Sequence, residues 1–156
     1  MGDRCYVEVI ARKEDKQAFE EIGFIVQEEP NETHGHPQLV KLVDEEANWA
    51  HYDDLMALAS KGIVFYGNHG AGCNYPSGEF ASNGKRYAQV ITADGQPVVP
   101  IDSQGRPSKA AVANAKRYLS VLRATREILG LERRRTRRKP HHNAHRQNHN
   151  TARKQK

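Results

Sequence analysis

The sequence has few cysteines and no long apolar segment, and both shortages exclude whole classes of protein. Its two cysteines, Cys5 and Cys73, form no C-x-x-C pair, which excludes the disulfide framework of small secreted domains. No apolar stretch approaches the roughly 18 residues that a transmembrane helix needs. The start, Met-Gly-Asp-Arg-Cys-Tyr, has no apolar signal segment. We therefore expect a soluble, intracellular protein of the cytoplasm with no membrane partner.

Acidic and basic side chains are unevenly distributed along the chain. Residues 1–130 contain 14 basic and 18 acidic side chains, whereas residues 131–156 contain 10 basic side chains and a single acidic one, Glu132. From Glu132 onward no apolar residue is larger than alanine, so this segment cannot bury enough surface to offset its ordering entropy. We predict a compact domain over residues 1–130 and a disordered Arg/His-rich basic tail over residues 131–156.

The first half of the chain alternates strand-like and helix-like patterns. Cys5, Val7 and Val9 share one face of a predicted first strand. A helical repeat of apolar residues begins at Tyr52 and stops at Gly62. In order, the patterns predict a strand at 5–11, a helix at 14–22, strands at 24–27 and 38–43, a helix at 52–61 and a strand at 63–66. This order over residues 4–66 is that of a split β-α-β, or ferredoxin-like, unit.

Two glycine dipeptides predict a meander after this unit. Asn83-Gly84 and Asp94-Gly95 are strong signals for two-residue hairpin turns, because type I′ turns need positive φ at both central residues. They divide residues 79–101 into a three-stranded antiparallel meander. Pro97 and Pro100 place its last strand at a sheet edge.

A long helix is predicted to follow the meander. Ser108 is suited to cap its first turn, and an apolar stripe continues from there to Gly130. We expect this helix to cover one face of the sheet, which makes the fold class α+β. The single tryptophan, Trp49, is assigned to the core, the usual place of a lone tryptophan.

An arginine-rich block directly after this helix is the strongest functional signal. It consists of Arg133, Arg134, Arg135, Arg137, Arg138 and Lys139. Such a block binds RNA or DNA phosphates by releasing counterions, and arginine-rich segments often fold on RNA. A solubilising tail, a localisation signal and a docking segment for an acidic protein surface are the alternatives. Nothing in the block encodes sequence specificity.

The glycine-rich stretch from Gly67 to Gly78 is the second candidate site. It matches neither G-x-G-x-x-G nor the P-loop pattern, and a hairpin follows it where a phosphate site needs a helix. Long glycine-containing loops on a rigid scaffold often carry function. We predict a partner-binding loop that contacts nucleic acid or a protein through Tyr66, His69, Tyr75, Lys85, Arg86 and Tyr87.

The sequence supports a metal site or a catalytic site less well than it supports a binding site. His69 and Cys73 have a chelating spacing, yet a structural zinc site usually has paired ligands at both ends. The tail histidines suit a polar, pH-sensitive extension of the basic tail better than a metal site. The adjacent carboxylate pairs lie on predicted helices, where their side chains diverge. We therefore assign no catalytic residue, no metal and no cofactor.

These observations support three ranked hypotheses. The first is a non-enzymatic binding protein whose Arg-rich tail contacts RNA, DNA or a nucleic-acid-containing protein complex. The second is a protein–protein inhibitor or adaptor, such as an accessory protein of a phage or mobile element, that acts through its acidic domain. The third, with the least support, is a metal-dependent enzyme at the His69/Cys73 loop.

Overall fold

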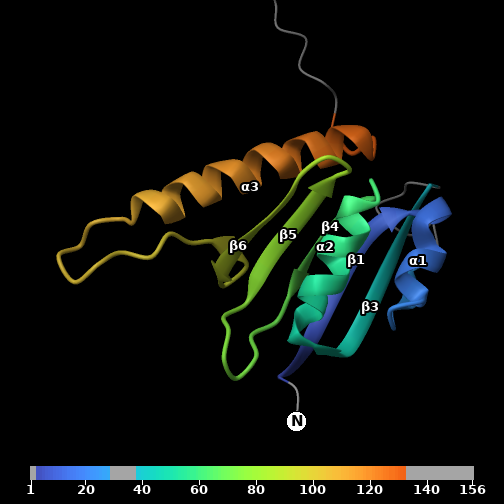
Figure 1. The fold of residues 1–156 in the computed structure, drawn as a ribbon, viewed down its shortest axis with the longest axis horizontal. Coiled ribbons are helices and arrows are strands. Elements are labelled where there is room, and N and C mark those ends of the chain that lie inside the picture. Colours follow the sequence, from blue (N-terminus) through green and yellow to red (C-terminus); the bar gives the residue numbers. More distant parts are fainter. Residues whose placement is uncertain (1–2, 29–37, 133–156) are drawn as a thin grey trace, which may run out of the picture.

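The computed structural model describes residues 3–28 and 38–132. Its strands form one seven-stranded antiparallel sheet in the order β2-β3-β1-β4-β5-β6-β7. The strands are β1 (Arg4–Arg12), β2 (Ile25–Glu28), β3 (Leu39–Asn48), β4 (Val64–His69), β5 (Gly78–Asn83), β6 (Tyr87–Ala93) and β7 (Gln96–Pro97). The helices are η1 (Lys13–Asp15), α1 (Lys16–Glu20), η3 (Trp49–His51), α2 (Tyr52–Ser60) and α3 (Lys109–Ile128). In Figure 1, α3 runs along β5 and β6, and α1 and α2 lie toward β1 and β3.

The two faces of the sheet carry separate cores. Because successive strand residues point to opposite faces, Cys5, Val7 and Val9 join the core under α1 and α2, whereas Ile10 faces the α3 side. This confirms the predicted face of the first strand. The core under α1 and α2 also contains Phe19, Phe24, Leu55, Leu58, Phe65 and Phe80, all of them buried.

The core under α3 depends on small side chains in the sheet. Ala81 and Ala88 lie opposite each other in the β5–β6 pair. Both are buried against Tyr118 and Val121 of α3, so the long helix can lie close to the sheet. The Tyr118 hydroxyl donates a hydrogen bond to Glu79 Oε2 over 2.7 Å. The predicted long helix over one sheet face is thereby confirmed.

Helix ends follow the local sequence signals. The Ser108 hydroxyl accepts a hydrogen bond from the backbone N–H of Ala111, as predicted for a capping residue. Gly62 follows α2 with a φ of 88°, a left-handed conformation that glycine adopts without strain.

One of the two predicted hairpin turns has the expected form. Asp94 and Gly95 have φ values of 50° and 71° and connect β6 to β7 as a two-residue turn. At Asn83-Gly84 the predicted hairpin is present, but its turn lies one residue further along, around Gly84 and Lys85. Asn83 N donates to the Arg86 carbonyl oxygen over 3.2 Å, and the Asn83 side chain accepts hydrogen bonds from the backbone N–H groups of Lys85 and Arg86.

The α+β class and the antiparallel meander of β5, β6 and β7 are confirmed, but the meander is not a separate sheet. β4 continues to His69 and pairs with β5, so all strands belong to one sheet. Among residues 3–28 and 38–132, no helix is long and apolar enough to cross a membrane. The basic tail, from Arg133 onward, lies outside the described residues.

Candidate functional site

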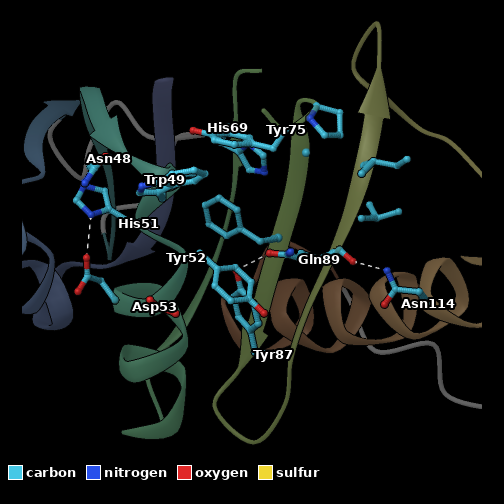
Figure 2. Close-up of a pocket in the computed structure, with 17 residues that line it drawn as sticks. Asn48, Trp49, His51, Tyr52, Asp53, His69, Tyr75, Tyr87, Gln89 and Asn114 are labelled. Atoms are coloured by element: carbon cyan, nitrogen blue, oxygen red, sulfur yellow. Dashed lines mark hydrogen bonds and ion pairs between the residues drawn. The ribbon is translucent and has the colours of Figure 1, made fainter. Parts of the chain in front are cut away.

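A pocket of about 730 Å³ lies where α2, the β4–β5 connection and β6 meet. Aromatic side chains form much of its lining: Trp49, Tyr52, His69, Tyr75, Phe80 and Tyr87. Tyr87 and Gln89 point to the same side of β6, because residues two apart share a face of a strand. Figure 2 shows Trp49 and Tyr52 on the α2 side of this pocket, with Gln89 and Asn114 across from them.

The aromatic rings form a continuous series of contacts around the pocket. Trp49 and Tyr75 have ring centroids 6.1 Å apart, and Tyr75 and His69 have centroids 5.7 Å apart. His69 is stacked on Phe80 at 6.4 Å with an angle of 10°. Phe65 in the core touches both Phe80 and Tyr87, and Tyr87 meets Tyr52 edge-on at 6.5 Å. The pocket wall is therefore continuous with the packed core.

Two glycines within strands make room for this wall. A Cβ at Gly67 would lie 2.0 Å from the Glu8 carbonyl oxygen and 2.8 Å from the Phe80 ring. A Cβ at Gly78 would lie 2.5 Å from His69 Nε2. Gly67 lies in β4 and Gly78 lies in β5, and the missing side chains leave space for the neighbouring rings. The loop between the two strands is therefore shorter than the predicted Gly67–Gly78 segment.

Trp49 reaches the pocket through an unusual backbone turn. Trp49, Ala50 and His51 have φ values of 51°, 53° and 52°, a run of left-handed residues without glycine. Each such residue costs on the order of 1 kcal/mol, and strained backbone of this kind concentrates at functional sites. The turn leaves Trp49 52% exposed, so its assignment to the core is wrong. Local sequence favours no such turn, and distant contacts must hold it.

His51 supplies one of these contacts. Its Nε2 lies 2.8 Å from Asp44 Oδ2 and its Nδ1 lies 3.1 Å from Asp54 Oδ2. Its ring also packs on Phe24, with centroids 4.9 Å apart. The end of the left-handed turn is thereby tied to β3 and to α2.

Asp3 supplies the second set of contacts. Its carboxylate accepts hydrogen bonds from the backbone N–H groups of Cys73 (2.6 Å) and Asn74 (2.7 Å), and its carbonyl oxygen accepts one from Trp49 N (2.9 Å). The bond from the Cys73 backbone is the main cause that lowers the Asp3 pKa. Asp3 therefore joins the β4–β5 loop to the Trp49 turn.

Tyr75 is held in the same loop. Its hydroxyl donates to Cys5 Sγ over 3.1 Å, and burial, followed by this contact with Cys5, raises the Tyr75 pKa. Gly72 allows the loop to pack tightly, because a Cβ there would lie 2.6 Å from Asp3 Oδ1. These contacts fix the Tyr75 ring beside Trp49.

Among the described residues that line the pocket there is no lysine or arginine. Asp53, at the start of α2, lines the pocket and is exposed, and it makes no hydrogen bond or ion pair within the described part of the chain. Gln89 is held in place: its side-chain oxygen accepts from the Tyr87 hydroxyl (3.3 Å), and its carbonyl oxygen accepts from Asn114 Nδ2 (2.8 Å). The pocket thus offers aromatic faces, amide groups and an unpaired carboxylate.

The outer face of α3 has the opposite electrostatic character. Lys109, Lys116, Arg117 and Arg123 are exposed, and none of them forms an ion pair with a described residue. The helix carries five basic side chains and one acidic one, whereas residues 1–108 carry nine basic and 17 acidic ones. The excess of basic over acidic side chains therefore begins at α3, within residues 1–130.

The basic row on α3 passes the edge of the pocket at Asn114. Asn114 lines the pocket and is hydrogen-bonded to β6, as described above. Arg117, one turn further along α3, donates from Nη2 to Asn114 Oδ1 over 2.8 Å. An aromatic pocket without cations and a helix surface rich in cations are therefore adjacent.

The structure brings together half of the partner-binding residues predicted from the sequence. His69, Tyr75 and Tyr87 line the pocket. Tyr66 faces the opposite side of the sheet, where the Arg126 guanidinium lies 6.0 Å from its ring centroid. Lys85 and Arg86 are exposed in the β5–β6 connection, outside the pocket lining. The block from Arg133 to Lys139 lies outside the described residues.

Sequence reasoning missed several members of the pocket. Trp49 and Tyr52 enter it only because of the left-handed turn, which no short motif predicts. Gln89 and Asn114 come from a strand and a helix that the sequence does not show to be neighbours. The alternation of Tyr87 and Gln89 in β6 was the available signal for a shared face.

The third hypothesis placed a metal-dependent site at the His69/Cys73 loop. His69 Nδ1 donates to the Gly70 carbonyl oxygen over 2.9 Å, and Cys73 is an exposed free thiol. In the part of the chain that the structure describes, no group of three His, Cys, Asp or Glu side chains is arranged to hold a metal ion.

A scan against protein-family models, a search of curated proteins and a search of solved structures each found no match to this chain.

Proposed function

We propose that this chain is a non-enzymatic nucleic-acid-binding protein. In this proposal the exposed cations of α3, together with Arg133, Arg134, Arg135, Arg137, Arg138 and Lys139, take the phosphates of RNA or DNA. The observation that carries it is the unpaired basic row of Lys109, Lys116, Arg117 and Arg123, which leads directly into the arginine-rich block.

The basic row on α3 differs from the rest of the described chain in how many of its cations are paired. Four of the five cations of α3 form no ion pair with a described residue, and neither do Lys13, Lys61, Lys85 and Arg86. The other five of the nine cations in residues 1–108 are each paired with a carboxylate: Arg4, Arg12, Lys16, Lys41 and Arg106. Such pairs neutralise the cation and leave little attraction for an anionic partner. The cations of α3 keep their charge available, and phosphate contacts are the main source of sequence-independent affinity for nucleic acid.

A salt titration with matched variants tests this role. The double variant K116A/R123A removes two exposed cations from α3, and K13A/K61A removes two exposed lysines from the body. Binding of a fluorescent single-stranded oligonucleotide is followed by anisotropy at several salt concentrations. Each lost phosphate contact lowers the slope of log K against log salt by about 0.7.

We expect K116A/R123A to reduce the slope by on the order of one and K13A/K61A to leave it near the wild-type value. Equal slopes for all three proteins would contradict the role of α3. Absence of salt-dependent binding by the wild-type chain would contradict the proposal as a whole.

A protein–protein inhibitor or adaptor is the second candidate. The excess of acidic over basic side chains in residues 1–108 supports it, because an acidic surface suits a basic cleft on a partner. Affinity capture with and without nuclease separates the two candidates. A partner that stays bound after nuclease treatment and after removal of residues 133–156 favours the inhibitor.

For the fold we infer a split β-α-β, or ferredoxin-like, unit over residues 4–69. The order β2-β3-β1-β4, with antiparallel pairing and with α1 and α2 as the crossovers, supports this inference. The remaining strands then extend the unit at the β4 edge.

A further inference from the structure

We infer that the aromatic pocket is the base-binding subsite of the same nucleic-acid site, and that it takes an unpaired base bearing an exocyclic amino group. This inference rests on the proposed function and adds a substrate class to it. The pocket volume of about 730 Å³ falls in the range of small-molecule sites and exceeds the size of a single base.

The aromatic faces suit an unpaired base. Trp49 and Tyr52 are the most exposed pocket rings, at 52% and 43%, so both offer surface for stacking. Their neighbours Tyr75 and Tyr87 are partly buried and restrained by the contacts described above. Proteins bind single strands by stacking bases on such rings, which a base within a duplex cannot reach.

Charge across the pocket gives a bound nucleotide one orientation. Asp53 and Asp54 line the pocket from α2. Asn114 lies across the pocket from Asp53 (Figure 2) and accepts a hydrogen bond from Arg117. A phosphate is repelled by the carboxylates and attracted by Arg117 and the row behind it. The base edge therefore faces α2, and the sugar-phosphate backbone leaves the pocket along α3.

Asp53 determines which base edge is favoured. A carboxylate only accepts hydrogen bonds, and Asp53 has no partner among the described residues. The exocyclic amino groups of cytosine, adenine and guanine donate to such an acceptor, whereas uracil and thymine present a carbonyl oxygen at the position of the cytosine amine. The pocket should therefore prefer cytosine to uracil, two bases of equal size.

Trp49 provides a direct readout, because it is the single tryptophan of the chain and lies in the pocket. The full-length protein is titrated with oligo(dC), oligo(dU) and an abasic strand, each of about ten nucleotides. Anisotropy reports affinity, and Trp49 fluorescence reports occupation of the pocket. Tetramethylammonium is titrated as a probe of simple cation binding to the rings.

We expect oligo(dC) to quench Trp49 and to bind on the order of 10-fold more tightly than the abasic strand. We also expect it to bind on the order of 10-fold more tightly than oligo(dU), the effect of a hydrogen bond to a charged acceptor. In D53N the new amide can donate to uracil, so the difference between oligo(dC) and oligo(dU) should close. D94N, which removes an exposed carboxylate from the β6–β7 turn, should retain it.

Four results would overturn the inference. If the abasic strand binds as tightly as oligo(dC) and Trp49 is unchanged, the pocket takes no base although the proposed function stands. Equal affinities of wild type for oligo(dC) and oligo(dU) contradict amine selection. Quenching by tetramethylammonium without quenching by any oligonucleotide identifies a cation site instead. Failure of every strand to bind contradicts the proposed function itself.

Discussion

The Trp49 side of the pocket and the outer face of α3 differ in what holds them in place. The Trp49 turn is left-handed at each of its residues, and it is held by Asp3 and by the pairing of His51 with Asp44. The α3 face comes from a regular, capped helix whose charges follow from its own sequence. The first region is built by contacts between distant residues, and the second is built locally.

This difference separates two kinds of contribution to binding. Exposed cations on a helix can be removed one by one, with graded and salt-dependent effects. A pocket wall that depends on a strained turn should respond to changes far from the ligand, because the turn loses its geometry as a unit. The following variants test this contrast, from the largest expected effect to the smallest.

Removal of residues 133–156 should have the largest effect on binding. The truncation eliminates 10 basic side chains, including the arginine-rich block, and leaves the buried clusters of both sheet faces intact. We expect affinity for a single strand to fall on the order of 100-fold near physiological salt, with a shallower salt slope. Unchanged affinity, measured by anisotropy on a protein with wild-type thermal stability, would rule out the arginine-rich block as a binding element.

Substitution of His51 by alanine should have the largest effect on stability. It leaves Asp44 and Asp54 without their shared partner and removes a ring from Phe24. We expect a loss of about 2 kcal/mol in the free energy of unfolding, measured by urea denaturation. H69A is the control variant, because it removes another histidine of the pocket without removing an ion pair between described residues. A smaller loss in H51A than in H69A would mean that His51 does not hold the turn.

Glycine substitutions can separate strain from burial. Ala50 is buried in the left-handed turn, whereas Ala57 is exposed in the middle of α2. In a regular helix, alanine to glycine costs about 1 kcal/mol. At Ala50 the relief of left-handed strain offsets this cost. We therefore expect A50G to be less destabilising than A57G in urea denaturation, the reverse of the order that burial alone predicts.

The pH dependence of the loop anchor should be the smallest effect. The folded state lowers the Asp3 pKa, chiefly through the hydrogen bond from the Cys73 backbone. A lowered carboxylate pKa contributes stability above the unfolded value, and this contribution disappears as the pH falls below about 4. Trp49 fluorescence should therefore change in this acid range. At neutral pH, D3N should already show the Trp49 fluorescence that the wild type shows in acid. Wild-type fluorescence in D3N would mean that Asp3 does not hold the Trp49 turn.

Local signals in the sequence predicted much of the fold. Ser108, Gly62 and Asp94-Gly95 act through their immediate neighbours, so caps and turns at these positions could be recognised without knowledge of the tertiary structure. The alternation of Cys5, Val7 and Val9 assigned the buried face of β1 for the same reason. The union of the meander with the first four strands escaped prediction, because it depends on the pairing of β4 with β5.

The candidate site was less predictable than the fold. His69, Tyr75 and Tyr87 were singled out, but the sequence gives no sign that Trp49 occupies a left-handed turn, since this depends on Asp3 and Asp44. Gly67 and Gly78 were assigned to a glycine-rich loop, whereas they lie in β4 and β5 and leave space for Phe80 and His69. Residues that act through distant partners are the ones that local patterns do not reveal.

A salt series of the oligo(dC) and abasic-strand titrations tests the central claim most directly. If α3 and the arginine-rich block take phosphates while the pocket takes a base, both strands should lose affinity with the same salt slope. Their ratio of affinities, on the order of 10-fold, should stay constant, because stacking on Trp49 and Tyr52 involves no phosphate. A ratio of one at every salt concentration, or a ratio that vanishes as salt rises, would contradict the division of roles between the pocket and the basic helix.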